Sequence, residues 1–268
     1  MSGARPNMRV SLIVTTYNWK EALAVVLASA FAQTRLPDEI IVADDGSSDG
    51  TGDLVRKVAK QATVLVHHSW QEDKGFRVAR SRNRAIATAT GDYVILIDGD
   101  IILDRHFVED HLAAARQGFF IQGGRVLLDE RKTGEGLAHR EMTLSFFASG
   151  LANRKNILRS KLLSRFFSCE TYGLGGIKTC NFAFFRSDAL VVNGFDEDFE
   201  GWGREDSDFA ARLLNYGIRR LNLRFQAVAF HLYHPVQSRE RLVLNDVKLA
   251  ETISAGKVQC VNGIRQLK

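Results

Sequence analysis

The stretch YVILIDGD, residues 93–100, runs from five apolar residues directly into two acids spaced one apart. A run this short and rich in β-branched residues is typical of a buried parallel strand. Side chains two apart on a strand point to the same face, so Asp98 and Asp100 can present their carboxylates to one ligand, and Gly99 allows close approach. Oxygen ligands suit Mg²⁺ or Mn²⁺. A strand followed by an acidic turn explains the same residues without any ligand. The choice between a metal site and a plain turn therefore depends on the rest of the chain.

Strands alternate with helices on both sides of this stretch. Apolar runs predict strands at 10–16, 39–43, 63–66 and 119–126, and helical spacing predicts helices at 20–33, 51–60 and 103–117. This β-α-β order predicts a single α/β domain with a mostly parallel sheet flanked by helices and joined by right-handed crossovers. The carboxyl ends of parallel strands share one edge, so we expect Thr15, Asp44 and Asp98 to lie there together.

Polar residues follow each predicted strand. Thr15, Tyr17 and Asn18 follow the first strand, and Asp45 follows the second, although turns and helix caps use the same residue types. Four arginines occupy residues 77–84, just ahead of the Asp98 strand. They fit a solvated helix face, but their guanidinium groups also match the oxygens of a diphosphate. We favour the second interpretation because a candidate metal site follows.

The second half of the chain carries a further group of polar residues. Residues 201–208, GWGREDSD, precede a helix predicted over 209–216, so the acids are either helix caps or functional groups. Trp202 between two glycines suggests an aromatic platform of the kind that sugar rings favour. His231 and His234 follow a late predicted strand, where a lone histidine is usually structural but two could complete a metal shell through neutral ring nitrogens.

The composition limits the classes of function. The 268 residues are 45% hydrophobic and 25% charged, as expected for a globular domain with one core. The net charge of +5 admits anionic partners, but the basic residues are scattered, which disfavours nucleic acid. Three widely spaced cysteines argue against a disulfide framework and suggest a reducing cytoplasm. No apolar run reaches about 18 residues, so we expect any membrane association to be peripheral.

Residues 131–169 differ in character from the rest, with basic residues interleaved among leucines and phenylalanines. Such a segment can lie on an anionic membrane surface. On a helical wheel, however, the basic and apolar residues do not separate cleanly, so a helical insertion packed on the domain is an equal alternative. Residues 236–268 form a C-terminal extension of unassigned role.

Taken together, the motifs resemble those of a known family. TTYN at 15–18, DDGS at 44–47, ARSRN at 79–83 and DGD at 98–100 resemble the nucleotide-sugar half of family 2 glycosyltransferases, which have the GT-A fold. NFA at 181–183, GFDE at 194–197, GWGRED at 201–206 and FH at 230–231 look like the acceptor half of the galactosyltransferase and chondroitin-polymerase-like branch. The resemblance covers residues 9–235, with halves at 9–126 and 170–235.

The resemblance implies a role for each matched residue. Three of them, Thr15, Tyr17 and Asp45, would hold the uridine. Arg82 and Asp98 would contact the ribose or diphosphate of the donor. The full set expected to bind the donor or orient the ligands is Thr15, Tyr17, Asn18, Asp45, Arg77, Arg82, Asp98 and Trp202. Asp100 and His231 would ligate the metal, with Asp98 beside them. Asp206 would be the general base, with Glu205 and Trp202 orienting the acceptor. One departure is Arg204, which stands where the family often has a small residue.

The implied reaction agrees with elementary chemistry. A divalent ion, Mn²⁺ or Mg²⁺, can stabilise a departing diphosphate as a Lewis acid, and one carboxylate suffices to deprotonate an attacking hydroxyl, which predicts inversion. We therefore expect a UDP-sugar donor, galactose-type favoured, and a glycan or lipid-linked glycan acceptor, as in lipopolysaccharide or capsule synthesis at the inner face of the cytoplasmic membrane. The alternatives are a haloacid-dehalogenase-type phosphohydrolase, for which the Asp-Gly-Asp motif lies too late in the chain, and a non-catalytic glycan-binding module.

Overall fold

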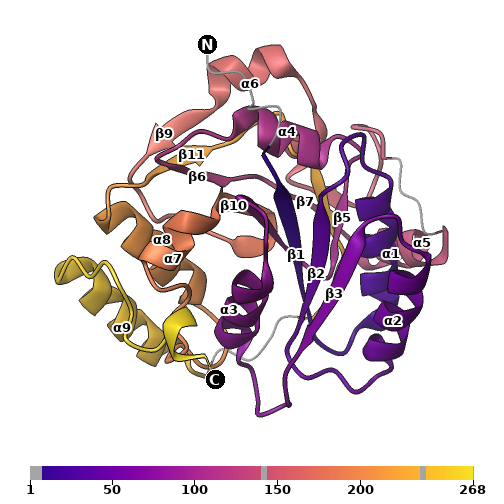
Figure 1. Cartoon of the computed structure of the whole chain (residues 1–268). Helices are drawn as coiled ribbons and strands as arrows, with labels where there is room; N and C mark the ends of the chain where they lie inside the picture. The colour runs from indigo at the N-terminus through magenta and orange to yellow at the C-terminus, as the bar shows by residue number, and fades with distance from the viewer. Residues whose placement is uncertain (1–7, 140–143, 236–239, 268) are drawn as a thin grey trace.

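An eight-stranded sheet forms the centre of the protein (Figure 1), in a computed structural model that describes residues 8–139, 144–235 and 240–267. The strand order is β3-β2-β1-β4-β10-β6-β11-β9. The strands are β1 (Val10–Thr16), β2 (Glu39–Asp44), β3 (Leu65–Trp70), β4 (Tyr93–Asp98), β6 (Phe119–Gln122), β9 (Cys169–Thr171), β10 (Phe182–Phe185) and β11 (Arg219–Asn222). β10 runs antiparallel to β4 and β6, and β9 runs antiparallel to β11. The sheet is therefore mostly parallel, as the alternation of elements predicts.

A second sheet of four short strands was not predicted. Its order is β5-β12-β7-β8, with β5 (Ile101–Leu103), β12 (Ala229–His231), β7 (Val126–Leu128) and β8 (Leu151–Ala152). The strand predicted at 119–126 is thus two strands in different sheets, and the helix predicted from 103 begins only at Phe107. β12 pairs with β5 immediately after Asp100, and the Leu232 N–H donates to the Asp100 carbonyl at 2.9 Å. This pairing brings the late histidines to the end of β4.

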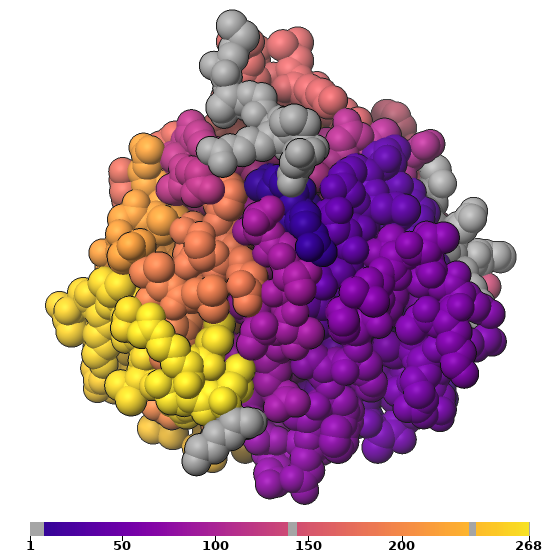
Figure 2. Space-filling view, in the orientation of Figure 1, coloured from indigo at the N-terminus to yellow at the C-terminus, as the bar shows by residue number. Residues whose placement is uncertain are grey.

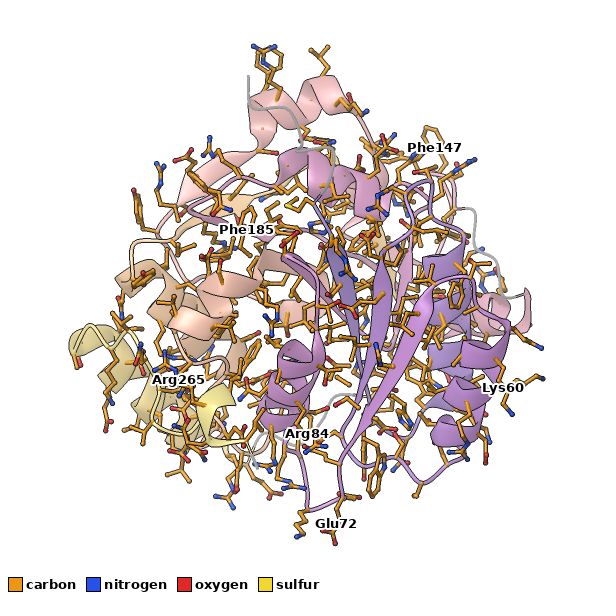
Figure 3. The ribbon with its side chains drawn as sticks, viewed as in Figure 1. Lys60, Glu72, Arg84, Phe147, Phe185 and Arg265 are labelled. Carbon is orange, nitrogen blue, oxygen red and sulfur yellow. The ribbon has the colours of Figure 1, made fainter. Side chains whose placement is uncertain are left out.

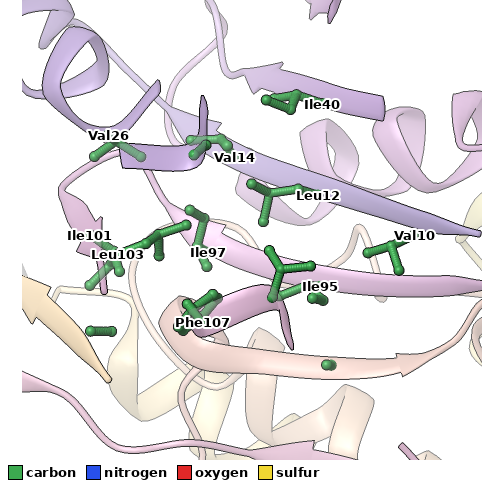
Figure 4. Close-up of a cluster of buried hydrophobic side chains, with 14 of the residues drawn as sticks. Val10, Leu12, Val14, Val26, Ile40, Ile95, Ile97, Ile101, Leu103 and Phe107 are labelled. Atoms are coloured by element: carbon green, nitrogen blue, oxygen red, sulfur yellow. The ribbon is translucent and has the colours of Figure 1, made fainter. Parts of the chain in front are cut away.

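Helices cover both faces of the large sheet (Figure 1). One face packs against α1 (Lys20–Phe31), α2 (Thr51–Gln61) and α4 (Phe107–Ala114), and the other against α3 (Val78–Thr88), α7 (Arg186–Val191) and α8 (Glu205–Asn215). Figure 4 shows the first core, where Leu12 and Ile95 from neighbouring strands lie with Val26 of α1 and Phe107 of α4, all fully buried. Strands covered on both faces need continuous apolar runs, which explains why these segments do not alternate with polar residues.

The C-terminal segment packs closely on α8. In α9 (Leu242–Ser254), the Thr252 hydroxyl donates to Oδ1 of Asp208 at 2.7 Å, and both side chains are buried. Arg212, one turn further along α8, donates to the other Asp208 oxygen at 2.8 Å and to the carbonyls of Val192 and Gly194. Buried charges are tolerated only when paired and hydrogen-bonded. The Thr252 hydroxyl therefore joins α9 to a buried ion pair within α8.

Replacing Thr252 by Val should destabilise the fold measurably. The variant keeps the shape of the side chain but removes one hydrogen bond to a buried carboxylate, which typically contributes about 1.5–3 kcal/mol. A lower urea midpoint with an unchanged m-value would show this loss. Thr88→Val is the control, because among the described residues the exposed Thr88 hydroxyl bonds only the Arg84 carbonyl of its own helix. Equal midpoints for the two variants would contradict a stabilising role for the α8–α9 contact.

The predicted insertion at 131–169 contains short elements at the surface. They are α5 (Glu130–His139), β8, a 3₁₀ turn at Arg154–Ile157 and α6 (Lys161–Phe167). Residues 140–143 of this insertion, and 236–239 and 268 of the C-terminal extension, lie outside the described residues. Within the described ranges, no helix combines the length and apolar character needed to cross a bilayer.

Candidate active site

The loops after β1 and β2 meet at the carboxyl edge of the large sheet. Asn18 N–H donates to the Ser47 hydroxyl at 2.8 Å, and Asn18 Oδ1 accepts from Ser48 N–H at 2.8 Å. Asp44 accepts from the backbone N–H groups of Gly46 and Ser47 and is fully buried, so it shapes the turn. Asp44 therefore has a structural role in the turn, whereas the Asp45 carboxylate has other hydrogen-bond partners.

Asp45 lies in a buried polar pocket. Its Oδ1 accepts from Gln71 Nε2 at 2.5 Å and its Oδ2 from the Arg77 backbone N–H at 2.8 Å. Burial raises the pKa of Asp45 to about 6, with these hydrogen bonds opposing the rise. Tyr17, which is half-exposed, donates its hydroxyl to Asp73 at 2.9 Å, and this hydrogen bond raises the pKa of Tyr17. Tyr17 and Asp45, two of the residues expected on the uridine, thus contact a loop at 71–77 of which only Arg77 was predicted.

Arg82 connects the two halves of the chain. Its guanidinium group donates through Nη2 to Asp98 Oδ1 at 3.3 Å and through Nη1 to Glu205 Oε1 at 3.0 Å, and its Nε lies 3.5 Å from the Thr15 hydroxyl. Arg82 is only 4% exposed. A guanidinium group is planar and always charged, so it can hold two carboxylates in fixed positions. One side chain therefore links the predicted donor acid to the acid beside the predicted base.

The other arginines of residues 77–84 do not all face Asp98. Arg80 donates to Glu197 at 2.8 Å, and Arg84 to the Trp70 carbonyl at 3.5 Å. The Arg77 side chain bonds the Glu72 carbonyl. Figure 3 shows Arg84 and Glu72 together at the lower edge of the molecule, beside this loop. Of the four, only Arg82 contacts a predicted site acid through its side chain.

Asp100 lies with two histidines in a group that can hold a metal ion. Its Oδ2 is 3.5 Å from His231 Nε2 and 3.2 Å from His234 Nε2, and one ligand atom from each residue lies within 4.8 Å of the others. Oδ1 of Asp100 is buried and accepts no hydrogen bond from the described residues. An orphaned carboxylate oxygen beside two imidazoles fits a divalent ion. Asp98 lies outside this group and is bound by Arg82 instead.

The pKa values of the two histidines are shifted in opposite directions. Burial lowers the pKa of His231 to about 4, so its ring is neutral and offers a lone pair. The hydrogen bond to Asp100 raises the pKa of His234. The motif resemblance assigned only His231, although the spacing His231-x-x-His234 was visible in the sequence. What the sequence could not show is that β12 places both rings against Asp100.

Glu205 and Asp206 begin α8 rather than preceding it. The helix predicted over 209–216 starts four residues earlier, so both acids occupy its first turn, where the helix dipole favours negative charge. Glu205 Oε2 is buried and accepts no hydrogen bond from the described residues. Burial raises the pKa of Asp206 to about 7, the neighbouring Glu205 adds to the rise, and Arg82 opposes it. A carboxyl with this pKa is suited to accept a proton near neutral pH.

The loop before α8 has a constrained backbone. Gly201, Gly203 and Arg204 all have positive φ, with Arg204 at 78°. Glycine adopts this region without steric cost, which gives a physical reason for small residues at this position in the family that the motifs resemble. Arg204 instead donates to Asp246 of α9 at 2.5 Å, and Asn245 donates to the Gly203 carbonyl at 2.9 Å. The C-terminal segment therefore holds the loop that carries Trp202.

Arg125 was not predicted from the sequence as a site residue, and Asn181 was quoted only within the NFA motif, without a role. Arg125 lies close enough to Asp98 and Asp100 that both acids raise its pKa, and it donates to Cys180 Sγ at 3.0 Å. Asn181 links His111, the Gly124 carbonyl and the Ala227 carbonyl. A Cβ at Gly123 would come within 2.3 Å of Asn181. These contacts depend on chain crossings that no local motif reports.

The protein, an open and mostly parallel sheet with acids at its carboxyl edge, has the GT-A class of fold. Two solved structures share it over almost the whole chain. The structure of S. aureus TarS residues 1–349 in complex with UDP has a TM-score of 0.62 and 19% identity, covering 96% of this chain and 68% of that one. The mannosyltransferase PcManGT from Pyrobaculum calidifontis, in complex with GDP-Man and Mn²⁺, has a TM-score of 0.61 and 20% identity, covering 99% and 67%.

The chain belongs to glycosyltransferase family 2. The family model described as "Glycosyl transferase family 2" matches residues 11–191, and the model described as "N-terminal domain of galactosyltransferase" matches residues 167–235. This membership confirms the family and the fold that the motifs predict, and it removes the phosphohydrolase alternative.

Curated relatives of the chain are longer proteins. The hyaluronan synthase of Pasteurella multocida is 27% identical over 78% of this chain, and the chondroitin synthase of Escherichia coli is 26% identical over 86%. The validoxylamine A glucosyltransferase of Streptomyces hygroscopicus subsp. limoneus is 28% identical over 81%. The matches span 23%, 36% and 51% of these relatives, respectively. The chain thus corresponds to one part of each.

Proposed function

We propose that this chain is an inverting, metal-dependent glycosyltransferase that moves a hexose or N-acetylhexosamine from a UDP-sugar to a hydroxyl of a glycan acceptor. The observation that carries the proposal is the Arg82 bridge, which joins Asp98 at the end of β4 to Glu205 beside Asp206. Donor and acceptor groups must meet in one site for direct transfer. Relatives named as hyaluronan and chondroitin synthases support a role in polysaccharide synthesis, and we favour a galactose-type donor because of the galactosyltransferase match.

In this proposal each group has one task. Tyr17, Asp45 and the loop at 71–77 hold the uridine, and Arg82 steadies the donor together with Asp98. Asp206 accepts the proton of the attacking hydroxyl, while Glu205 and Trp202 orient the acceptor. Asp100, His231 and His234 would hold Mn²⁺ or Mg²⁺, which when bound neutralises charge on the diphosphate as a Lewis acid.

The acceptor is proposed to be a glycan or lipid-linked glycan, as in lipopolysaccharide or capsule synthesis, with the enzyme at an anionic membrane surface. Several relatives support a cell-surface product, among them a glucosyltransferase of Escherichia coli named for a diphosphoundecaprenol-linked substrate, 34% identical over 91 residues. That match covers only 34% of this chain. The proposed acceptor is therefore supported by the names of relatives, and the proposed donor site by the contacts of Arg82, Asp98 and Asp45.

A panel of nucleotide sugars tests the proposal directly. With Mn²⁺ present, one UDP-sugar should raise the melting temperature of the protein, because a ligand that binds only the native state stabilises it. UDP should then be released when a glycan acceptor is added. Release of inorganic phosphate instead of UDP would indicate phosphohydrolysis. Binding without UDP release from any donor and acceptor combination would indicate a glycan-binding module and overturn the proposal.

A further inference from the structure

Helix α6 presents an apolar line and a basic line side by side. Leu162 and Phe166, four residues apart, are 67% and 72% exposed, and residues four apart on a helix are neighbours on its surface. Lys161 and Arg165 form the adjacent line and are also exposed. Ser164 is the buried residue of the helix and faces the domain. The helix therefore turns both lines toward solvent while remaining anchored.

This helix projects from the body of the protein. In Figure 2 the segment forms the uppermost part of the coloured surface, and Figure 1 shows α6 above α4. Figure 3 places Phe147, which is 85% exposed, at the same upper end, whereas Glu72 of the donor-site loop lies at the lower end. The surface formed by Leu162, Phe166 and their basic neighbours is thus separate from the donor-binding loop.

The segment that contains α6 carries basic residues and no acid of its own. Residues 144–169 contain five basic residues, Arg154, Lys155, Arg159, Lys161 and Arg165, and no acid. Two of the five are paired with the domain, Arg159 with Asp110 and Lys161 with Glu109 at 3.4 Å. Arg165 has no carboxylate within ion-pair distance in the part of the chain that the structure describes. Unpaired basic charge beside exposed aromatic side chains is the combination by which proteins attach to anionic lipid surfaces.

A hollow beside the helix adds a place for a headgroup. It has a volume of about 410 Å³ and lies between α6, the end of α4 and β11, with Lys161, Arg165 and Arg116 among its lining residues. Arg116 is bonded to Glu170, also in the wall, and Lys161 to Glu109, so among the described residues Arg165 is the basic side chain of the wall without a carboxylate partner. The hollow lies next to the exposed apolar line, so a phosphate group could occupy it while acyl chains contact Leu162 and Phe166.

We propose that α6 docks this protein on an anionic lipid bilayer, with Leu162 and Phe166 entering the interface and Lys161 and Arg165 binding lipid phosphates. The proposed function places the enzyme at an anionic membrane, and α6 is the surface that would contact it. This inference rests on the proposed function only for the choice of a membrane as the partner. A surface helix with two exposed apolar anchors gives reversible attachment rather than insertion. Attachment should therefore depend on lipid charge and on salt.

Vesicle flotation tests this without any sugar transfer. The protein should float with phosphatidylcholine vesicles that contain phosphatidylglycerol, and remain in solution with phosphatidylcholine alone or at high salt. Leu162→Glu with Phe166→Glu should lower bound protein by about tenfold or more, and Lys161→Gln or Arg165→Gln by about fivefold each. The matched control is Val243→Glu with Val247→Glu, on an equally exposed apolar face of α9, where the residues are 73% and 55% exposed.

Several outcomes would overturn the proposal. Binding that is equal in the α6 and α9 variants would show that α6 is not the contact. A dimer that dissociates in the α6 variant, measured by light scattering, would show that the surface binds a second copy instead. UDP binding measured in parallel separates the two proposals. An α6 variant that loses flotation but keeps its affinity for the donor supports docking through α6. Wild-type protein that floats but binds no UDP-sugar refutes only the proposed function.

Discussion

Replacing Asp206 by Asn should lower turnover by about 10²–10⁴-fold while leaving UDP affinity unchanged. General-base assistance typically contributes this much to rate, and the amide cannot accept the proton of the attacking hydroxyl. Asp206 occupies the first turn of α8, and its pKa, raised to about 7 by burial, is that of a group able to accept a proton near neutral pH. Initial rates with saturating UDP-sugar and acceptor would measure the loss, and calorimetry would measure UDP binding.

The pH profile gives an independent check. A base must be unprotonated in the free enzyme, so kcat/KM should fall about tenfold per pH unit below pH 7 and level off above it. The Asn variant should lose this limb. Asp53→Asn is the control, at an exposed acid of α2 whose ion pair within the described structure is with Arg56 of the same helix, and it should retain full activity and the wild-type profile. Full turnover in the Asp206 variant would show that another group acts as base.

The first four parallel strands of the large sheet could be predicted because each is a local apolar run, whereas β9 and β11 were not predicted. The run ending at Asp98 is apolar, β-branched and the right length, and the strand that precedes Thr15 repeats the pattern, so alternation with helices predicted their common edge. The second sheet could not be predicted in this way. β12 and β5 are three residues each and lie more than a hundred residues apart in sequence. Their pairing is decided by tertiary packing, which a short apolar run does not specify.

The candidate site shows the same division. Asp98, Asp100, Glu205 and Asp206 stand in motifs that chemistry singles out, and each lies at the end of a strand or the start of a helix. Gln71 and Asp73 gave no signal, because their role depends on contacts with Asp45 and Tyr17 across the sheet edge. The start of α8 was placed too late since the acids were taken as preceding the helix, although acids are also favoured inside a first turn. Local motifs thus select the candidate reactive groups, and tertiary contacts show which residues surround them.

Removing the Asp100 carboxylate should abolish the effect of Mn²⁺ on UDP binding. Asp100 is the only acid among the three residues that the described structure gathers as a candidate metal site, and its buried Oδ1 accepts no hydrogen bond there. Loss of an outer-sphere partner costs about 10–100-fold in metal affinity, so loss of a direct carboxylate ligand in Asp100→Ala should cost at least about 100-fold. Titration of UDP with and without Mn²⁺ would measure this, because only the wild type should bind more tightly with the ion.

Asp98→Asn is the matched control, since it changes the other acid of the same motif. Asp98 is held by Arg82, outside the group of Asp100, His231 and His234, so this variant should weaken donor binding yet keep the enhancement by Mn²⁺. His234→Ala should also lower the enhancement by Mn²⁺, although the motif resemblance assigns no role to His234. If Asp98→Asn removed the Mn²⁺ effect and Asp100→Ala preserved it, the roles of the two acids would be reversed, and the metal would lie nearer to Arg82 than to the histidines.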